Sequence, residues 1–174
     1  MEGFKTVAVM KMPKVDLDKS WSKSSAANFK RALTVSRQSA VDMAQTRLQK
    51  ALYASLESSV WAWPRTTLRV NGETAGTTRN IYDTGGLYAS QKIRVSHQVT
   101  QSKLTVTYNV PYAAFVHYGG MIQPYGNKNA NSVLVPARPW VEAVLNGTHG
   151  QEKLDLGKFI RDKIVRDLGE LVIS

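Results

Sequence analysis

The chain has no cysteine among its 174 residues, and no apolar run approaches the roughly 20 residues that a membrane helix needs. The lack of cysteine excludes disulfides, thiolate nucleophiles and thiolate metal sites, and it fits a reducing compartment. The beginning of the sequence also lacks the apolar core of a signal peptide. We therefore expect a soluble intracellular product without contact to a membrane.

Acidic residues are scarce. Asp and Glu number 13 against 23 Lys and Arg, so the formal net charge is +10. Between Thr74 and Val141 the only acidic residue is Asp83, against six Lys and Arg. Few carboxylates are left for paired acid–base catalysis. Such an imbalance favours an acidic partner, either nucleic acid or an acidic protein surface, and a solvated basic face is an equally good interpretation.

The three histidines stand apart in the sequence. His97, His117 and His149 have neither a carboxylate nor a second histidine at the spacing of a metal or catalytic site, so each is expected to be structural. Gly85-Gly86 lacks the lysine and the spacing of a phosphate-binding loop. We therefore expect no enzyme, no metal and no cofactor.

Period-two alternation is the clearest pattern in the chain. Apolar or aromatic residues and His97 alternate with polar ones over 93–99 and again over 104–110, and the polar residues Thr100-Gln101-Ser102 separate the two runs. Such a pair of runs predicts an antiparallel hairpin with one buried face. Lys92, Arg94 and Lys103 belong to the opposite, exposed face.

Helical periodicity dominates two other stretches. Residues 25–58 place apolar side chains on one stripe with Arg37 off it, and 156–172 repeat the pattern near the end of the sequence. The longer helix would measure about 50 Å. We expect it to bend, to break near Thr34-Val35-Ser36 or to project beyond the body. The fold class predicted is α+β, with an antiparallel β-sheet built on the central hairpin and packed against both helices.

Domain organisation is predicted as an arm followed by one domain. Residues 1–23 form the N-terminal arm, whose Lys5 and Lys11 flank β-branched residues as in an edge strand; addition of this strand to a neighbouring subunit is the alternative. Residues 24–174 form a single α+β domain. Loops are expected at 61–80, with a small hairpin across Asn71-Gly72, and at 121–135.

Three short motifs follow one another around the hairpin. A turn and short helix is expected first, a second short helix follows the hairpin, and two prolines then lead a third helix. The first two motifs would lie at opposite ends of the strands, and the prolines would hold Trp140 against the sheet. Arg138 would reach a carboxylate of its own chain or of a neighbouring subunit. The residues concerned are Asp83, Thr84, Gly85, Leu87 and Ser90; Tyr112, Ala113, Phe115, Val116, His117, Tyr118 and Gly119; and Pro136, Ala137, Arg138, Pro139 and Trp140.

In the order and spacing of these motifs the chain resembles the tail-completion or head–tail joining proteins of the bacteriophage neck. The resemblance implies a non-enzymatic virion protein that forms a ring, six-fold by expectation, between a head-side connector or stopper and a tail terminator or tail-tube protein. A terminator or stopper ring of the same neck and a non-specific DNA-binding protein are the alternatives. DNA in the channel is a further expected contact.

Two sets of residues are candidates for contact with partners. Lys92, Arg94, Lys103 and Lys128 are expected to face the channel or an acidic ring. Trp61, Trp63 and Tyr125 are candidate interface aromatics, although tryptophans beside a helix end serve equally well to close a core.

Overall fold

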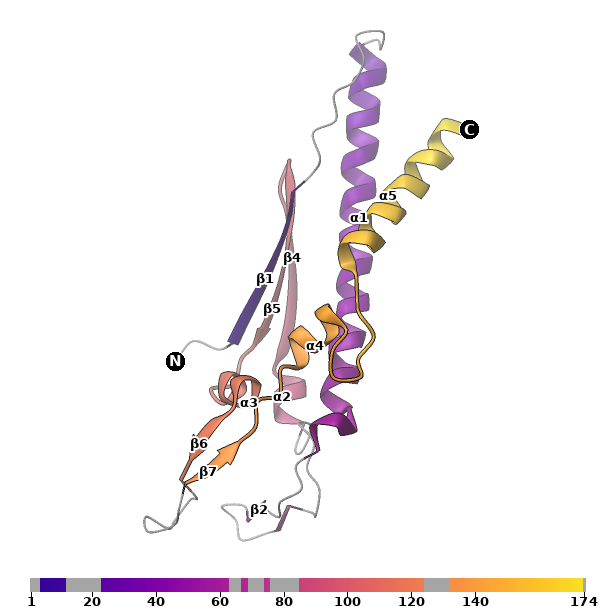
Figure 1. The fold of residues 1–174 in the computed structure, drawn as a ribbon. Helices are drawn as coiled ribbons and strands as arrows, with labels where there is room; N and C mark the ends of the chain where they lie inside the picture. Colours follow the sequence, from indigo (N-terminus) through magenta and orange to yellow (C-terminus); the bar gives the residue numbers. More distant parts are fainter. Residues whose placement is uncertain are drawn as a thin grey trace. The chain divides into compact units, whose positions relative to one another are not determined.

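The structure, a computed structural model, has an α+β fold (Figure 1). Contacts group the chain into two compact units. The first holds Met1–Lys5, Lys50–Lys92 and Val106–Leu154, and the second holds Thr6–Gln49, Ile93–Thr105 and Asp155–Ser174. The residues that the structure describes are 4–11, 23–62, 67–68, 74–75, 85–123 and 132–173.

The described residues form both helices and strands. The helices are α1 (Lys23–Glu57), the 3₁₀ turn η1 (Ser59–Trp61), α2 (Gly86–Ala89), α3 (Ala113–Tyr118), α4 (Trp140–Asn146) and α5 (Leu156–Ile173). The strands are β1 (Phe4–Lys11), β2 (Thr67–Leu68), β3 (Thr74–Ala75), β4 (Gln91–His97), β5 (Gln101–Tyr108), β6 (Gly120–Ile122) and β7 (Val133–Val135).

A three-stranded sheet has the order β1-β5-β4, which makes β5 its central strand and β1 an edge strand as expected. The hairpin is confirmed, but its turn lies two residues earlier in the sequence than expected. The turn lies at 98–100, where the backbone N–H of Gln98 donates to the carbonyl of Gln101 at 2.8 Å. Val99, expected on the buried face, is therefore 89% exposed, and Ser102, expected in the turn, is buried within β5.

Helix α1 is a single 35-residue helix and does not break near Thr34 (Figure 1). Its stripe is confirmed at positions four residues apart, where side chains lie above one another. Three expected members, Phe29, Leu33 and Ala51, are only half-buried. The buried apolar residues of α1 are Ala40, Val41, Ala44, Leu48, Leu52 and Leu56.

The expectation that Arg37 lies off the buried stripe is wrong, because its side chain is only 3% exposed. Nη1 donates to the carbonyl of Val99 at 3.0 Å, and Nη2 donates to that of Gln98 at 2.7 Å. A guanidinium carries five fixed N–H donors, so it can satisfy two turn carbonyls at once. Arg37 thereby fixes the hairpin turn of the second unit to α1.

Replacement of Arg37 by alanine should lower the free energy of unfolding by about 2–4 kcal/mol, because the two turn carbonyls lose their donors and a buried side-chain volume is emptied. Urea denaturation measures the loss. Arg37→Met fills the space without the donors and should cost less than Arg37→Ala. Arg31→Ala, an exposed arginine of the same helix, is the control and should change stability by no more than about 0.5 kcal/mol. Equal losses at the two arginines would contradict this role.

The core of the first unit gathers around Trp140, which begins α4 and is fully buried. Its ring centroid lies 5.3 Å from that of Tyr108 and 4.6 Å from that of His117, and both contacts are edge-to-face. The hydroxyl of Ser55 donates to the carbonyl of Trp140 at 3.2 Å. Trp140 thus packs against a strand of the sheet, as predicted from the two prolines that precede it.

Tyr108 closes the same core from β5. Its hydroxyl donates to Oε1 of Gln91 at 2.7 Å, which joins the end of β5 to the start of β4. Burial raises the pKa of Tyr108 above its ordinary value, while a hydrogen bond with Trp140 opposes that rise. The phenol therefore stays neutral and serves as a structural donor.

Of the short hairpins among the described residues, the sequence predicted β2–β3 and did not predict β6–β7. β2 pairs antiparallel with β3 across the segment that contains Asn71-Gly72, in agreement with the predicted small hairpin. β6 pairs antiparallel with β7, so the ends of the expected loop at 121–135 are strands instead. A strand of three residues is too short for an alternation of apolar and polar residues to be recognised in the sequence.

Helix α5 confirms the expected C-terminal helix and belongs to the second unit. Asp167 accepts hydrogen bonds from Lys163 on the same helix and from the hydroxyl of Ser36 on α1. Hydrogen bonds from these two donors, of which Lys163 has the larger effect, hold the pKa of Asp167 below its ordinary value. The guanidinium of Arg47 lies 4.0 Å from the ring centroid of Phe159, so α1 and α5 also meet through a cation–π contact.

Candidate interaction surface

The exposed face of the β4–β5 hairpin carries the candidate basic residues. Along β4, Lys92, Arg94 and Ser96 are exposed, while the residues between them are half-buried. Along β5, Lys103 is exposed between buried neighbours. The parity predicted from the sequence is thus confirmed for these strands.

The register of the hairpin places two cations close together. Nδ1 of His97 lies 2.9 Å from Oγ of Ser102, and the Gln98–Gln101 hydrogen bond continues the same register. This register sets Arg94 diagonally across from Lys103, at a separation of roughly 7–8 Å between Cα atoms in regular sheets. Residues 91–109 contain no Asp or Glu. The face therefore offers cations, hydroxyls and amides, which is the chemistry that phosphate or carboxylate groups bind.

His97 connects this hairpin to α1 on the other side. Its Nε2 lies 3.1 Å from Oδ1 of Asp42, so a serine, a histidine and an aspartate stand in a chain of hydrogen bonds. A carboxylate only accepts, so Nε2 carries the proton in this contact. The sequence did not indicate this carboxylate, because 55 residues separate it from His97. The sequence alone does not identify a carboxylate that lies far from its histidine along the chain, because only folding brings the two together.

This chain of three residues does not have the exposure that nucleophilic catalysis requires. The hydroxyl of Ser102 belongs to a residue with 0% exposure, whereas the side chain of Asp42 is 59% exposed. A nucleophile must be accessible to its substrate. Here the accessible residue is the carboxylate Asp42, and the hydroxyl of Ser102 is buried. His97 instead holds the hairpin of the second unit to α1.

His117 is the second histidine for which the structure supplies a carboxylate. It is fully buried in α3, and its Nε2 lies 2.5 Å from Oε2 of Glu142 on α4. Its ring stands edge-to-face against Trp140 and Tyr118. Burial lowers the pKa of His117 below its ordinary value, and Glu142 opposes that lowering without reversing it.

Acid should destabilise the protein through His117. The folded state favours the neutral imidazole, so the unfolded state binds the extra proton in the window between the ordinary pKa of 6.5 and the lower folded pKa. The free energy of unfolding should therefore fall as pH drops below about 6.5. Urea denaturation at several pH values measures this slope. His117→Gln should flatten it, and an unchanged slope in that variant would contradict the assignment.

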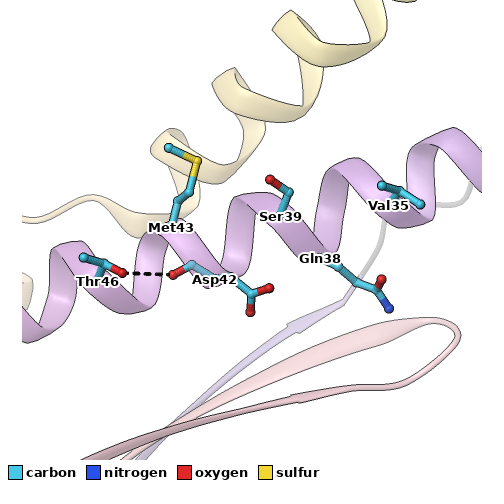
Figure 2. A pocket seen from close by; sticks show the side chains of 6 residues that line it. All are labelled: Val35, Gln38, Ser39, Asp42, Met43 and Thr46. Atoms are coloured by element: carbon cyan, nitrogen blue, oxygen red, sulfur yellow. Dashed lines mark hydrogen bonds between the residues drawn. The ribbon is translucent and has the colours of Figure 1, made fainter.

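The hollow on α1 does not form a substrate site. It has a volume of about 510 Å³, and all six lining residues come from that one helix (Figure 2). A substrate cleft requires walls from more than one side and convergent polar groups. In Figure 2 the labelled side chains project to different sides of the helix and do not converge on a common point. The lining residues are Val35, Gln38, Ser39, Asp42, Met43 and Thr46.

The expectation that the first two motifs lie at opposite ends of the strands is wrong. The backbone N–H of Asn109 donates to the carbonyl of Ser90 at 3.3 Å, which joins the residue after β5 to the residue before β4. In an antiparallel hairpin, the start of the first strand lies beside the end of the second strand, at the end opposite the turn. Both motifs therefore meet at that end, next to Tyr108 and Gln91.

The first motif forms a short helix, as expected. Gly85 has a left-handed backbone before α2, and the helix ends by Ser90, whose hydroxyl donates to the carbonyl of Leu87 at 2.8 Å. Gln91 then begins β4 and does not continue the helix. Leu87 is buried, so the motif fills the core of the first unit.

The helices expected in the second and third motifs are confirmed. α3 follows Pro111 and begins after Tyr112, with Ala113 buried, and it ends at Gly119. Pro136 and Pro139 flank Arg138, whose backbone N–H donates to the carbonyls of Val116 and His117 at 3.2 and 3.1 Å. α4 ends at Gly147.

Trp61 is not an exposed interface residue. It is only 5% exposed, and its indole N–H donates to the carbonyl of Ser55 at 2.7 Å. Its ring also contacts that of His149. The interpretation as a residue that closes the core is therefore correct. Five other candidates lie outside the described residues: Asp83, Thr84, Trp63, Tyr125 and Lys128.

Comparisons of the chain with protein-family models, with curated proteins and with solved structures find no match. Over the described ranges, no helix is both long and apolar enough to cross a membrane. The same ranges bring no three His, Asp or Glu side chains together in a group that could hold a metal ion. Among the described residues, the basic hairpin face with Lys92, Arg94 and Lys103 is the candidate interaction surface.

Proposed function

We propose that this chain is a structural ring subunit of a bacteriophage neck, where it joins the head connector to the tail. The support is the order of the motifs together with a surface suited to contact. The observation that carries the proposal is the hairpin face on which Lys92, Arg94 and Lys103 are exposed and no acidic residue of the strands accompanies them. A face of this kind suits a large acidic partner better than a small substrate.

Charge limits where this face can lie in a ring. Each copy carries +10, so six copies would hold about +60, and their mutual repulsion opposes closure. DNA in the channel or an acidic neighbouring ring would compensate that charge. We therefore assign Arg94 and Lys103 to contact with one of these two partners.

Deletion of the gene from the phage genome that carries it tests the proposal. The expected result, seen by electron microscopy, is DNA-filled heads and separate complete tails, with joined particles restored when the gene is supplied again. Normal joined particles after deletion would overturn the proposal. Arg94→Glu with Lys103→Glu should reproduce the defect without loss of folding. Lys158→Glu with Arg161→Glu, the same charge change on exposed positions of α5, is the control.

Non-specific DNA binding is the second candidate, and the same acid-free face favours it. The exposed residues of that face include no aromatic side chain among Lys92, Arg94, Ser96 and Lys103, so contact with phosphates is expected and base stacking is not. Binding to a duplex should weaken steeply with salt, by a slope of about −0.9 for each phosphate neutralised. Arg94→Gln should reduce that slope by about one. A salt-independent affinity, or none, would exclude this candidate.

A further inference from the structure

The β6–β7 ribbon is an exposed apolar surface that the basic face does not explain. Met121 and Leu134 are directly paired and are 61% and 63% exposed. Directly paired residues point to the same side of a sheet. Ile122, paired with Val133 on the other side, is 42% exposed, so both sides of the ribbon carry apolar side chains that water reaches.

The ribbon also lacks charge and a third strand. Residues 119–123 and 132–137 contain no Asp, Glu, Lys or Arg. Among the described residues, no further strand pairs with β6 or β7, so each has an open edge (Figure 1). An isolated two-stranded ribbon is marginally stable in water, and an apolar open edge is a site for pairing with another chain.

We infer that the β6–β7 ribbon is where one copy of this chain binds the next. Copies with a charge of +10 repel one another, so a contact between them is favoured where no charge has to be buried. The ribbon is such a place. A partner of opposite charge would instead be drawn to the basic hairpin face.

The exposed area agrees with this assignment. Tyr118 at the end of α3 is 66% exposed and adjoins the ribbon in sequence. With roughly 150–250 Å² for a large side chain, the exposed parts of Tyr118, Met121, Ile122 and Leu134 amount to on the order of 400 Å². A standard interface buries about 800 Å² on each partner, of which somewhat more than half is apolar. In a head-to-tail ring these side chains are divided between two contacts, so the ribbon supplies the apolar centre of each contact and not its whole area.

Ring closure gives the contact a direction. A ring requires two different surfaces of each subunit to meet, so the open edge of β6 in one copy pairs with the open edge of β7 in the next. This inference rests on the proposed function, because that function supplies the ring. It adds the surface through which the ring forms.

Single cysteines test the contact, since the natural chain has none. Purified Met121→Cys and Leu134→Cys proteins, mixed under mild oxidation, should form disulfide-linked dimers that contain one copy of each variant. Val165→Cys, at a position 66% exposed on α5, is the control and should give at least five-fold less crosslinked product. Crosslinking no greater than the control, or only dimers of like variants, would overturn the head-to-tail contact.

Sedimentation over a concentration series provides an independent measurement. The natural chain should self-associate, and Leu134→Glu should weaken that association at least ten-fold without changing the thermal unfolding midpoint. A chain that stays monomeric up to millimolar concentration would overturn the inference. Joined phage particles formed by Leu134→Glu would overturn the inference and leave the proposed function standing. Self-association through the ribbon with no defect after gene deletion would do the reverse.

Discussion

Truncation of Trp140 to alanine should lower the free energy of unfolding by about 3–5 kcal/mol, the largest loss that we expect from a single side chain. The indole is fully buried and makes edge-to-face contacts with Tyr108 and His117. Its removal leaves a cavity at the point where α3, α4 and β5 of the first unit meet. Urea denaturation followed by circular dichroism measures the loss.

Two variants separate burial from aromatic character. Trp140→Phe keeps a ring in place and should lose less than half as much as Trp140→Ala. Tyr118→Ala removes an aromatic side chain that is 66% exposed and should cost about 1 kcal/mol or less. If Trp140→Ala were no worse than Tyr118→Ala, the indole would not be central to this core.

Local periodicity predicted the strands and helices well because burial of one face imposes it on neighbouring residues. Leu104, Val106 and Tyr108 are buried in alternation with more exposed residues, as their spacing requires. The same rule placed Arg94 and Lys103 on the exposed face. It failed at Val99, since a turn of three residues interrupts the alternation and periodicity does not say where a turn begins.

Partners distant in sequence could not be predicted. Arg37 and the turn carbonyl of Val99 are 62 residues apart, and Ser36 and its acceptor Asp167 are 131 apart. Arg37 and Ser36 are polar residues that the helical pattern assigns to the solvent-exposed face of α1. Hydrogen bonds to distant residues compensate for their burial. Asp42 beside His97 was missed for the same reason.

The candidate surfaces differ in how much signal the sequence holds. The basic hairpin face follows from strand parity and the scarcity of acidic residues, and both are visible in the sequence. The β6–β7 ribbon has only three residues in each strand, and eight residues outside the described ranges lie between Gln123 and Ser132. Its pairing depends on how Gly119 brings the end of α3 against the residues that follow β7.

Replacement of Gly119 by alanine should therefore cost about 3 kcal/mol or more. The backbone φ of Gly119 is +72°, and an added Cβ would lie 2.6 Å from the nitrogen of Ala137 and 2.7 Å from the oxygen of Val135. These are backbone atoms, which cannot move aside as the end of a flexible side chain can, so strain and crowding add.

Gly150 offers a matched control for this substitution. It has the same φ of +72°, but a Cβ there would meet nothing within 4 Å. Gly150→Ala should therefore show only the conformational cost of about 1 kcal/mol. The difference in urea-denaturation free energy between the two variants combines the contact between Gly119 and the chain after β7 with the strain at ψ −175°, a backbone region that essentially only glycine adopts. Equal losses would mean that this contact contributes nothing, and the ribbon would then need another support.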